Sequence, residues 1–227
     1  CGRPICQTGG HTYRLSHEAD GVDGVRAAVR HEIRAGADCI KFMASGGMEL
    51  FPAEDPTHPQ YTVEELRAGV ETAHDQGLST AAHAYSTEGI YRAILAGVDS
   101  IEHGCLMTQE CVDLMAERNI ALVPTMTGIR AVSAVGPLAI LKDELQNRIY
   151  GPQEEGMRMA RKAGVRIGAG TDSGGKLSDE IRLIQQVLGE TPVEALAHAT
   201  GIAAQIARRP DLGLLEEGRK ANIVAFS

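Results

Sequence analysis

Four polar residues lie in or directly after short apolar segments, and their types are those that bind metals or move protons. Lys41 interrupts the apolar run DCIKFMASGG, His83 lies in STAAHAYS, His103 in SIEHG and Asp172 in GAGTDSG. Imidazole and carboxylate groups suit Zn²⁺, Mn²⁺ or Fe²⁺. A lysine ammonium binds no cation, but a buried lysine loses its proton readily. The resulting amine can add CO₂ to form a carbamate, whose two oxygens can bridge two cations.

Such a pair of cations would support hydrolysis. Metals ~3.5–4 Å apart can share a hydroxide and polarise a carbonyl group. Asp172 would accept the proton of that hydroxide and pass it to the leaving group. Taken singly, each residue has an ordinary alternative: a packed histidine, a lysine paired with a carboxylate, or an aspartate at a helix N-cap. Four such residues at matching depth on four strands favour the metal site.

Two further residues are candidates for substrate contact. His11 follows the first predicted strand in TGGHTYR, and Tyr85 lies two residues beyond His83. Both are expected at the end of the sheet where the metal ligands lie. For His11, a loop residue without a role is an almost equal alternative.

A repeated phrase in the sequence predicts the elements that hold these residues. Each copy has a helical stretch, a stop residue that tolerates a left-handed C-cap, and a short apolar strand. The stop residues are Gly36, Gly77, Gly97, Asn119 and Gly164. The predicted strands are 4–8, 38–43, 79–84, 99–103, 120–126 and 165–171. Alternating strands and helices indicate an α/β fold with a parallel sheet.

The sheet could belong to an open doubly wound fold or to a (β/α)₈ barrel. A barrel usually needs ~250 residues, so six strand–helix units would leave it two units short. Either way, polar residues at the carboxyl ends of the strands are where active sites lie. After the repeat, 191–207 predicts a helix with Thr191 at the N-cap and Pro192 at the first helical position. LGLLEEGRKANIVAF then predicts a turn and a final strand.

Composition narrows the class of protein. The chain has 227 residues, is 43% hydrophobic, and has a formal net charge of −8. No basic run is present, so we expect no nucleic-acid partner, and no segment approaches the ~20 apolar residues of a membrane span. Five cysteines without a CxxC pair favour reduced thiols and a cytoplasmic protein. Because the chain begins at Cys1 rather than Met, an upstream signal peptide stays open.

Together these motifs resemble the amidohydrolase superfamily of metal-dependent (β/α)₈ hydrolases. IKFMASGG is similar to the fourth-strand motif with a carboxylated lysine, AAHAYS and SIEHG to the fifth- and sixth-strand histidine motifs, and GAGTDSG to the eighth-strand aspartate motif. The resemblance covers essentially the whole chain. It implies a partial barrel, strands three to eight, over residues 1–209. Residues 210–227 would begin the return into a small C-terminal β-sandwich.

The TGGH phrase and the lysine are most similar to the prolidase-like group, which includes Xaa-Pro dipeptidases and imidazolonepropionase-related proteins. The resemblance implies two divalent ions, most simply Zn²⁺, bridged by carboxylated Lys41. His83 and His103 would bind one ion, and Asp172 would complete the other and act as the base. His11 and Tyr85 would contact the substrate, a dipeptide or another small molecule. No membrane partner is expected, and a homo-oligomer stays open.

One departure from the family is large. The family's first strand carries an HxH pair that binds the more buried metal, and this chain has no HxH. We therefore expect a fragment of a longer protein, which alone does not hydrolyse amides efficiently although the parent does. A natural short relative that has lost catalysis is the alternative, with a structural or binding role. A deaminase or a cyclic-amide hydrolase of the same superfamily is the other alternative. Deamination ranks lower because neither His83 nor His103 is followed by Glu at the third position.

Overall fold

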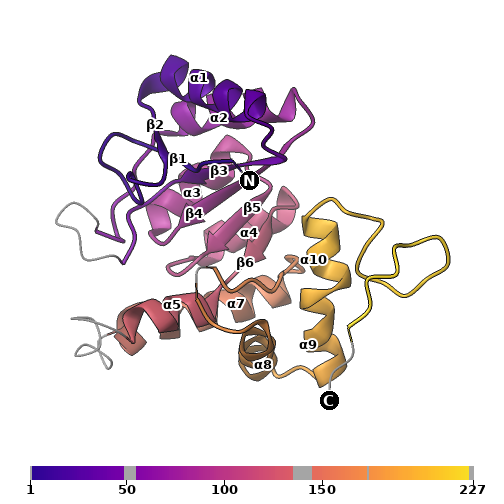
Figure 1. Cartoon of the computed structure of the whole chain (residues 1–227). Coiled ribbons are helices and arrows are strands. Elements are labelled where there is room, and N and C mark those ends of the chain that lie inside the picture. Colours follow the sequence, from indigo (N-terminus) through magenta and orange to yellow (C-terminus); the bar gives the residue numbers. More distant parts are fainter. Residues whose placement is uncertain (1, 49–54, 135–144, 173, 225–227) are drawn as a thin grey trace.

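The computed structural model describes residues 2–48, 55–134, 145–172 and 174–224 (Figure 1). Its centre is one sheet in which all neighbouring strands run parallel, in the order β2-β1-β3-β4-β5-β6. The strands are β1 (Ile5–Cys6), β2 (His17–Glu18), β3 (Cys39–Met43), β4 (Ser79–Ala84), β5 (Ser100–His103) and β6 (Ala121–Val123). The predicted α/β class with a parallel sheet is therefore confirmed.

Helices connect the strands and pack on one another in chain order. The helices are α1 (Gly21–Arg34), α2 (Val63–His74), α3 (Thr87–Ala96), α4 (Gln109–Glu117), α5 (Met126–Ser133), α7 (Gly151–Lys162), α8 (Leu177–Leu188), α9 (Pro192–Ala199) and α10 (Gly201–Ile206), with a π-helical turn, η2, at Gln146–Tyr150. α1 packs on α2, α2 on α3 and α3 on α4, and the series continues through α7 and α8 to α9. Figure 1 shows this row running from α1 and α2 at one side of the sheet to α9 and α10 at the other.

The two faces of the central strands differ in chemistry. Ile40 and Phe42 of β3 and Ile101 of β5 are fully or almost fully buried in the main apolar core, together with helix residues such as Leu66. Because side chains alternate along a strand, the other face of β3 carries Lys41. The helices thus cover one face, and the polar candidates lie on the other.

The local signals for helix ends are confirmed. The side chains of Thr62, Ser86 and Thr108 accept hydrogen bonds from the third residue of α2, α3 and α4 respectively. Thr191 and Glu194 form a reciprocal capping box at α9. All five predicted stop residues have positive φ, between 57° and 91°. Capping oxygens satisfy N–H groups that a helix leaves without partners, so these ends are encoded locally.

Two predictions about the elements are wrong, and one strand was missed. Segment 165–171 is not a regular strand: its pairing with β6 is limited to one parallel bridge between Ile167 and Leu122, and the N–H of Ala169 donates to the carbonyl oxygen of His198 in α9. The edge strand β2 has no apolar residue and was not predicted. The helix expected over 191–207 breaks at Thr200, whose φ of −125° and ψ of −99° separate α9 from α10.

The described part of the C-terminal segment, 210–224, forms turns and irregular chain. The final strand and the proposed division at 209/210 stay predictions, since 225–227 lie outside the described residues.

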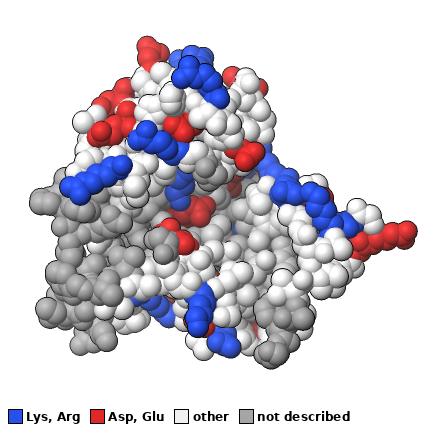
Figure 2. Space-filling model, in the orientation of Figure 1, with Lys and Arg blue, Asp and Glu red and all other residues white. Residues whose placement is uncertain are grey.

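Cys6, Cys39, Cys105 and Cys111 are free thiols. No helix in the described part of the chain is both long and apolar enough to cross a membrane. On the face shown in Figure 2, basic and acidic side chains are intermixed.

Candidate metal centre

His83 and His103 lie side by side at the carboxyl ends of β4 and β5. Their ring centroids are 4.6 Å apart, and both side chains are buried. The strand register aligns His103 with Ala84 rather than with His83, which would direct it toward the helices. His103 has a left-handed φ of 72°, so the chain turns at this residue and its ring meets that of His83.

Each histidine uses one ring nitrogen in a hydrogen bond, and its other ring nitrogen is left to bind a metal. Nε2 of His83 lies 3.1 Å from the carbonyl oxygen of Gly46, which can only accept, so Nδ1 carries the lone pair. Nδ1 of His103 lies 2.5 Å from the hydroxyl oxygen of Thr125, which can accept a hydrogen bond from an Nδ1–H group and thereby favour the tautomer with its lone pair on Nε2. A hydrogen bond at the second nitrogen is the usual way in which proteins orient a metal-binding histidine.

Electrostatics keep both rings neutral. Burial lowers the pKa of His83 well below its usual value, and the nearby charges of His103, His11 and Lys41 lower it further. The pKa of His103 is lowered in the same way, by burial first and then by Lys41 and His11. Because a histidine binds a cation only in its neutral form, the two imidazoles are in the state that a metal requires.

Lys41 lies at the middle of β3, half-buried, opposite Ala81 of β4. His83 follows two residues further along β4, so its side chain projects from the same face of the sheet as that of Lys41. The small side chain of Ala81 leaves room beside the lysine. Within the described residues, no carboxylate forms an ion pair with Lys41. The alternative of a lysine neutralised by a buried acid therefore has no support in this part of the chain.

His11 packs directly on the centre. Its ring stacks on that of His83 with centroids 4.2 Å apart, and its backbone N–H donates to the Gln60 side chain. A side chain at Gly47 would collide with the His11 ring. This glycine is therefore needed for the ring to approach, and the SGG phrase after β3 has a structural reason. The histidine reaches the end of the sheet that we predicted for it.

Tyr85 lies against both histidines. Its ring stacks on that of His103 with centroids 4.9 Å apart and meets the ring of His83 edge-on at 4.8 Å. The backbone N–H of Tyr85 donates to the hydroxyl of Ser45. The tyrosine therefore forms one wall of the centre, next to the two candidate ligands.

Asp172 is less closely associated with the centre. It is exposed, has a left-handed φ of 55°, and follows Gly170 in a turn. Its Cβ would contact a side chain placed at Gly128, so it lies against the first turns of α5. Among the described residues, His83, His103 and Asp172 do not form a group whose ligand atoms all lie within 4.8 Å of one another. The structure therefore unites the lysine and the histidines but leaves the aspartate apart.

Sequence reasoning missed the residues that hold His103. Gln153 of α7 is buried and donates its side-chain amide to the carbonyl oxygens of His103 and Pro124. Glu180 of α8 accepts hydrogen bonds from the backbone N–H groups of Met126 and Thr127 and from the Thr127 hydroxyl. These contacts fix the segment that carries Thr125. Pro124 and Thr125 lie within the predicted strand 120–126, whereas β6 ends at Val123, so the sequence analysis gave no signal for this turn.

The chain is similar to known proteins over nearly its full length. The model of the amidohydrolase family matches residues 4–227. Ochratoxinase from Aspergillus niger is 37% identical over 215 residues, which are 92% of this chain and 44% of that protein. An uncharacterized protein from Mycobacterium bovis, Mb2939c, is 32% identical over 222 residues, 92% of this chain and 57% of its own length. The chain thus spans about half the length of the curated relatives it matches.

Solved structures agree. The crystal structure of A. niger ochratoxinase has a TM-score of 0.87 at 33% identity, covering 97% of this chain and 57% of that one. A Xaa-Pro dipeptidase with bound methionine in its active site has a TM-score of 0.82 at 33% identity, covering 96% and 59%. The predicted resemblance to the superfamily and its prolidase-like group is confirmed. The chain belongs to the amidohydrolase family.

Proposed function

We propose that this chain supplies the lysine–histidine half of a metal-dependent hydrolase that cleaves a peptide-like or N-acyl amide bond, in the manner of a dipeptidase or prolidase. Because the chain covers only about half the length of its relatives, the activity is proposed for a protein that includes the rest of the fold. That fold would be a (β/α)₈ barrel to which this chain contributes strands three to eight. The helices on one face and the polar residues on the other support the barrel.

The observation that carries the proposal is the shared face of β3 and β4 with the adjacent end of β5. Lys41, without a carboxylate partner among the described residues, lies next to two buried neutral imidazoles. A half-buried amine beside neutral histidines does not improve packing. It is useful where a cation can bind, because a carbamate on Lys41 would supply the negative charge that the histidines lack.

The donor set fits a pair of divalent ions, most simply Zn²⁺. His83 would ligate through Nδ1 and His103 through Nε2, while carboxylated Lys41 would bridge to a second ion near Asp172. When bound, such ions polarise the scissile carbonyl and acidify water. Asp172, which is exposed, would take up the proton and deliver it to the leaving nitrogen.

His11 and Tyr85 would hold the substrate. The structures of two relatives contain methionine and N-methylphosphonate-L-proline. Both ligands are an amino acid or an analogue that contains one. This supports a small substrate with an amino-acid leaving group for the present protein. We assign the two aromatic side chains that border the histidines to the walls of that substrate site.

The test is a substrate panel with the protein at the length of its relatives. Xaa-Pro dipeptides, N-acyl amino acids and a cyclic amide are compared, with product detected by amine release. We expect hydrolysis of one of the first two classes, abolished by His103→Asn and retained in His58→Asn, whose side chain is exposed. Ring opening of the cyclic amide alone would favour the alternative hydrolase. No turnover by a folded, metal-loaded protein would favour a structural role.

A further inference from the structure

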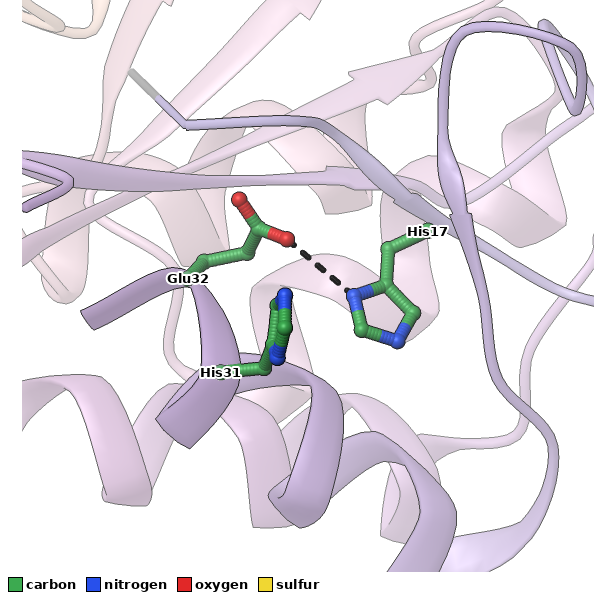
Figure 3. A group of neighbouring side chains, drawn as sticks. All are labelled: His17, His31 and Glu32. Atoms are coloured by element: carbon green, nitrogen blue, oxygen red, sulfur yellow. Dashed lines mark hydrogen bonds and ion pairs between the residues drawn. The ribbon is translucent and has the colours of Figure 1, made fainter. Parts of the chain in front are cut away.

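A second group of possible metal ligands lies outside the candidate metal centre. Within the described residues, His17, His31 and Glu32 have ligand atoms that all lie within 4.8 Å of one another. His17 comes from the edge strand β2, and the other two come from the last turn of α1. Figure 3 shows the His31 ring standing beside the His17–Glu32 pair, with one nitrogen toward the carboxylate.

One pair of the three ligands already has the spacing of a coordination shell. Nδ1 of His17 and Oε1 of Glu32 are 3.1 Å apart. Two ligands at ~2.0–2.1 Å from a tetrahedral Zn²⁺ lie about 3.3 Å apart. The rings of His17 and His31 are nearly perpendicular, with centroids 5.0 Å apart, and a ring nitrogen of each lies within 4.8 Å of the Glu32 carboxylate. An ion could therefore replace the His17–Glu32 hydrogen bond with little rearrangement.

The burial of the Glu32 carboxylate indicates that this position favours the binding of a cation. Its side chain is only 3% exposed, although it lies in the last turn of a surface helix. Fully buried glutamates are rare unless they are paired. Among the described residues, its partners are the backbone N–H of Arg3 and the ring of His17, while the Arg3 guanidinium donates to the carbonyl oxygen of Ser16. The carboxylate is thus not neutralised by a lysine or arginine in the described part of the chain.

The cluster is separate from the candidate metal centre. Arg3, whose N–H contacts Glu32, precedes β1, and the last turn of α1 leads back to the start of β3. His83 and His103 lie at the opposite, carboxyl ends of the strands. Ions at the two places would share no ligand.

We propose that His17, His31 and Glu32 form a second metal site, which takes a borderline divalent ion such as Zn²⁺ and ties the edge strand β2 to α1. Two imidazoles and one carboxylate suit this class of ion better than Mg²⁺ or Ca²⁺. His17 is partly exposed and His31 exposed, so the remaining coordination position faces solvent and water fills it. We assign the site a structural role, because its ligands connect the edge strand β2 to the last turn of α1.

Binding has one identifiable cost. Arg34 lies 3.3 Å from Nδ1 of His31. A metal on Nε2 leaves the proton on Nδ1, so the arginine can no longer donate there. Both side chains are exposed, and an exposed contact of this length contributes little. The attraction between the bound cation and the Glu32 carboxylate is larger than the loss of the Arg34–His31 contact.

The experiment compares Zn²⁺ binding by the metal-free full chain and by variants, using competition with a fluorescent zinc indicator. We expect His31→Asn to bind one Zn²⁺ per chain fewer than the unmodified protein. Glu32→Gln should show the same loss, but its buried position makes the exposed His31 the safer variant. His58→Asn is the matched control, because His58 has a carboxylate 3.8 Å away but belongs to no group of three possible metal ligands among the described residues. Zinc bound at the candidate metal centre is the same in all variants, so it does not contribute to the difference between them.

A second readout locates the ion. Long-range ¹H–¹⁵N NMR spectra of the histidines should show that Zn²⁺ shifts one ring nitrogen of His17 and one of His31. Equal zinc binding by the unmodified chain and folded His31→Asn would overturn the proposal. So would ring nitrogens of His31 that do not respond to zinc.

Discussion

Glu180 offers a direct test of how the fold positions His103. It is fully buried and accepts three hydrogen bonds at the start of α5, at 2.9, 2.7 and 2.8 Å. Burial raises the pKa of this carboxyl, while the hydrogen bonds from Thr127 and Met126 act against the rise. Hydrogen bonds to charged groups contribute about 1.5–3 kcal/mol each. The free-energy cost of burying the charge of Glu180 offsets part of the sum of these hydrogen-bond contributions.

We expect Glu180→Ala to lower the free energy of unfolding by about 3 kcal/mol, because buried N–H groups lose their acceptor. Glu180→Gln keeps one oxygen and should lose about 1 kcal/mol. Urea unfolding followed by circular dichroism measures both. Glu194→Ala is the control: Glu194 also accepts hydrogen bonds at a helix start, from the N–H and the hydroxyl of Thr191, but it is exposed, so the loss of stability should be much smaller.

Thr125 immediately precedes the residues that Glu180 holds, so the same variant should weaken zinc binding at His103. A Glu180→Ala protein as stable as the unmodified chain would refute the energetic reasoning. A destabilised variant with unchanged zinc affinity would refute the link to His103.

Three further outcomes are expected. Thr125→Val removes the hydrogen bond that orients His103 and should weaken zinc binding ~10–100-fold, measured by indicator competition; unchanged affinity would count against the assigned tautomer. In the metal-free chain, lowering pH from 7.5 to 5.5 should cost stability, because the unfolded state takes up protons at its ordinary histidine pKa of about 6.5 while the buried rings, with lowered pKa, do not. The loss is up to ~1.4 kcal/mol per ring per pH unit below 6.5, and His83→Gln should show a smaller loss in urea unfolding; an equal loss would contradict this. Gly47→Ala should displace the His11 ring and shift its NMR resonances; an unmoved ring would contradict the close approach.

Much of the fold follows from local chemistry in the sequence. Ser86 and Gly97 cap the two ends of one helix, α3. Each acts on residues close to it in the chain, so short-range patterns suffice to find them. The edge strand β2 could not be found in this way, since its two polar residues pair with β1 through backbone groups alone. The prediction of a strand at 165–171 was wrong for the opposite reason. Its apolar residues are typical of a strand, but its pairing with β6 is limited to the single bridge at Ile167.

The candidate metal centre was predictable in its residue types but only partly in its geometry. Alternation along β3 and β4 correctly predicted one face for Lys41 and His83. It could not predict His103, because a left-handed φ at the strand end overrides alternation. The exposed position of Asp172 likewise depends on a turn packed against α5. Such contacts join residues far apart in the chain, and no local pattern encodes them.

The role of Lys41 is tested most directly by the metal content of the protein at the length of its relatives, compared with that of Lys41→Ala. We expect two Zn²⁺ at the candidate metal centre, a carbamate carbon signal in ¹³C NMR after labelling with ¹³CO₂, and loss of one ion, that signal and most amide hydrolysis in the variant. Lys162→Ala, which removes an exposed lysine at the end of α7, should change none of these. Full metal content and full activity in Lys41→Ala would show that Lys41 is not a metal ligand.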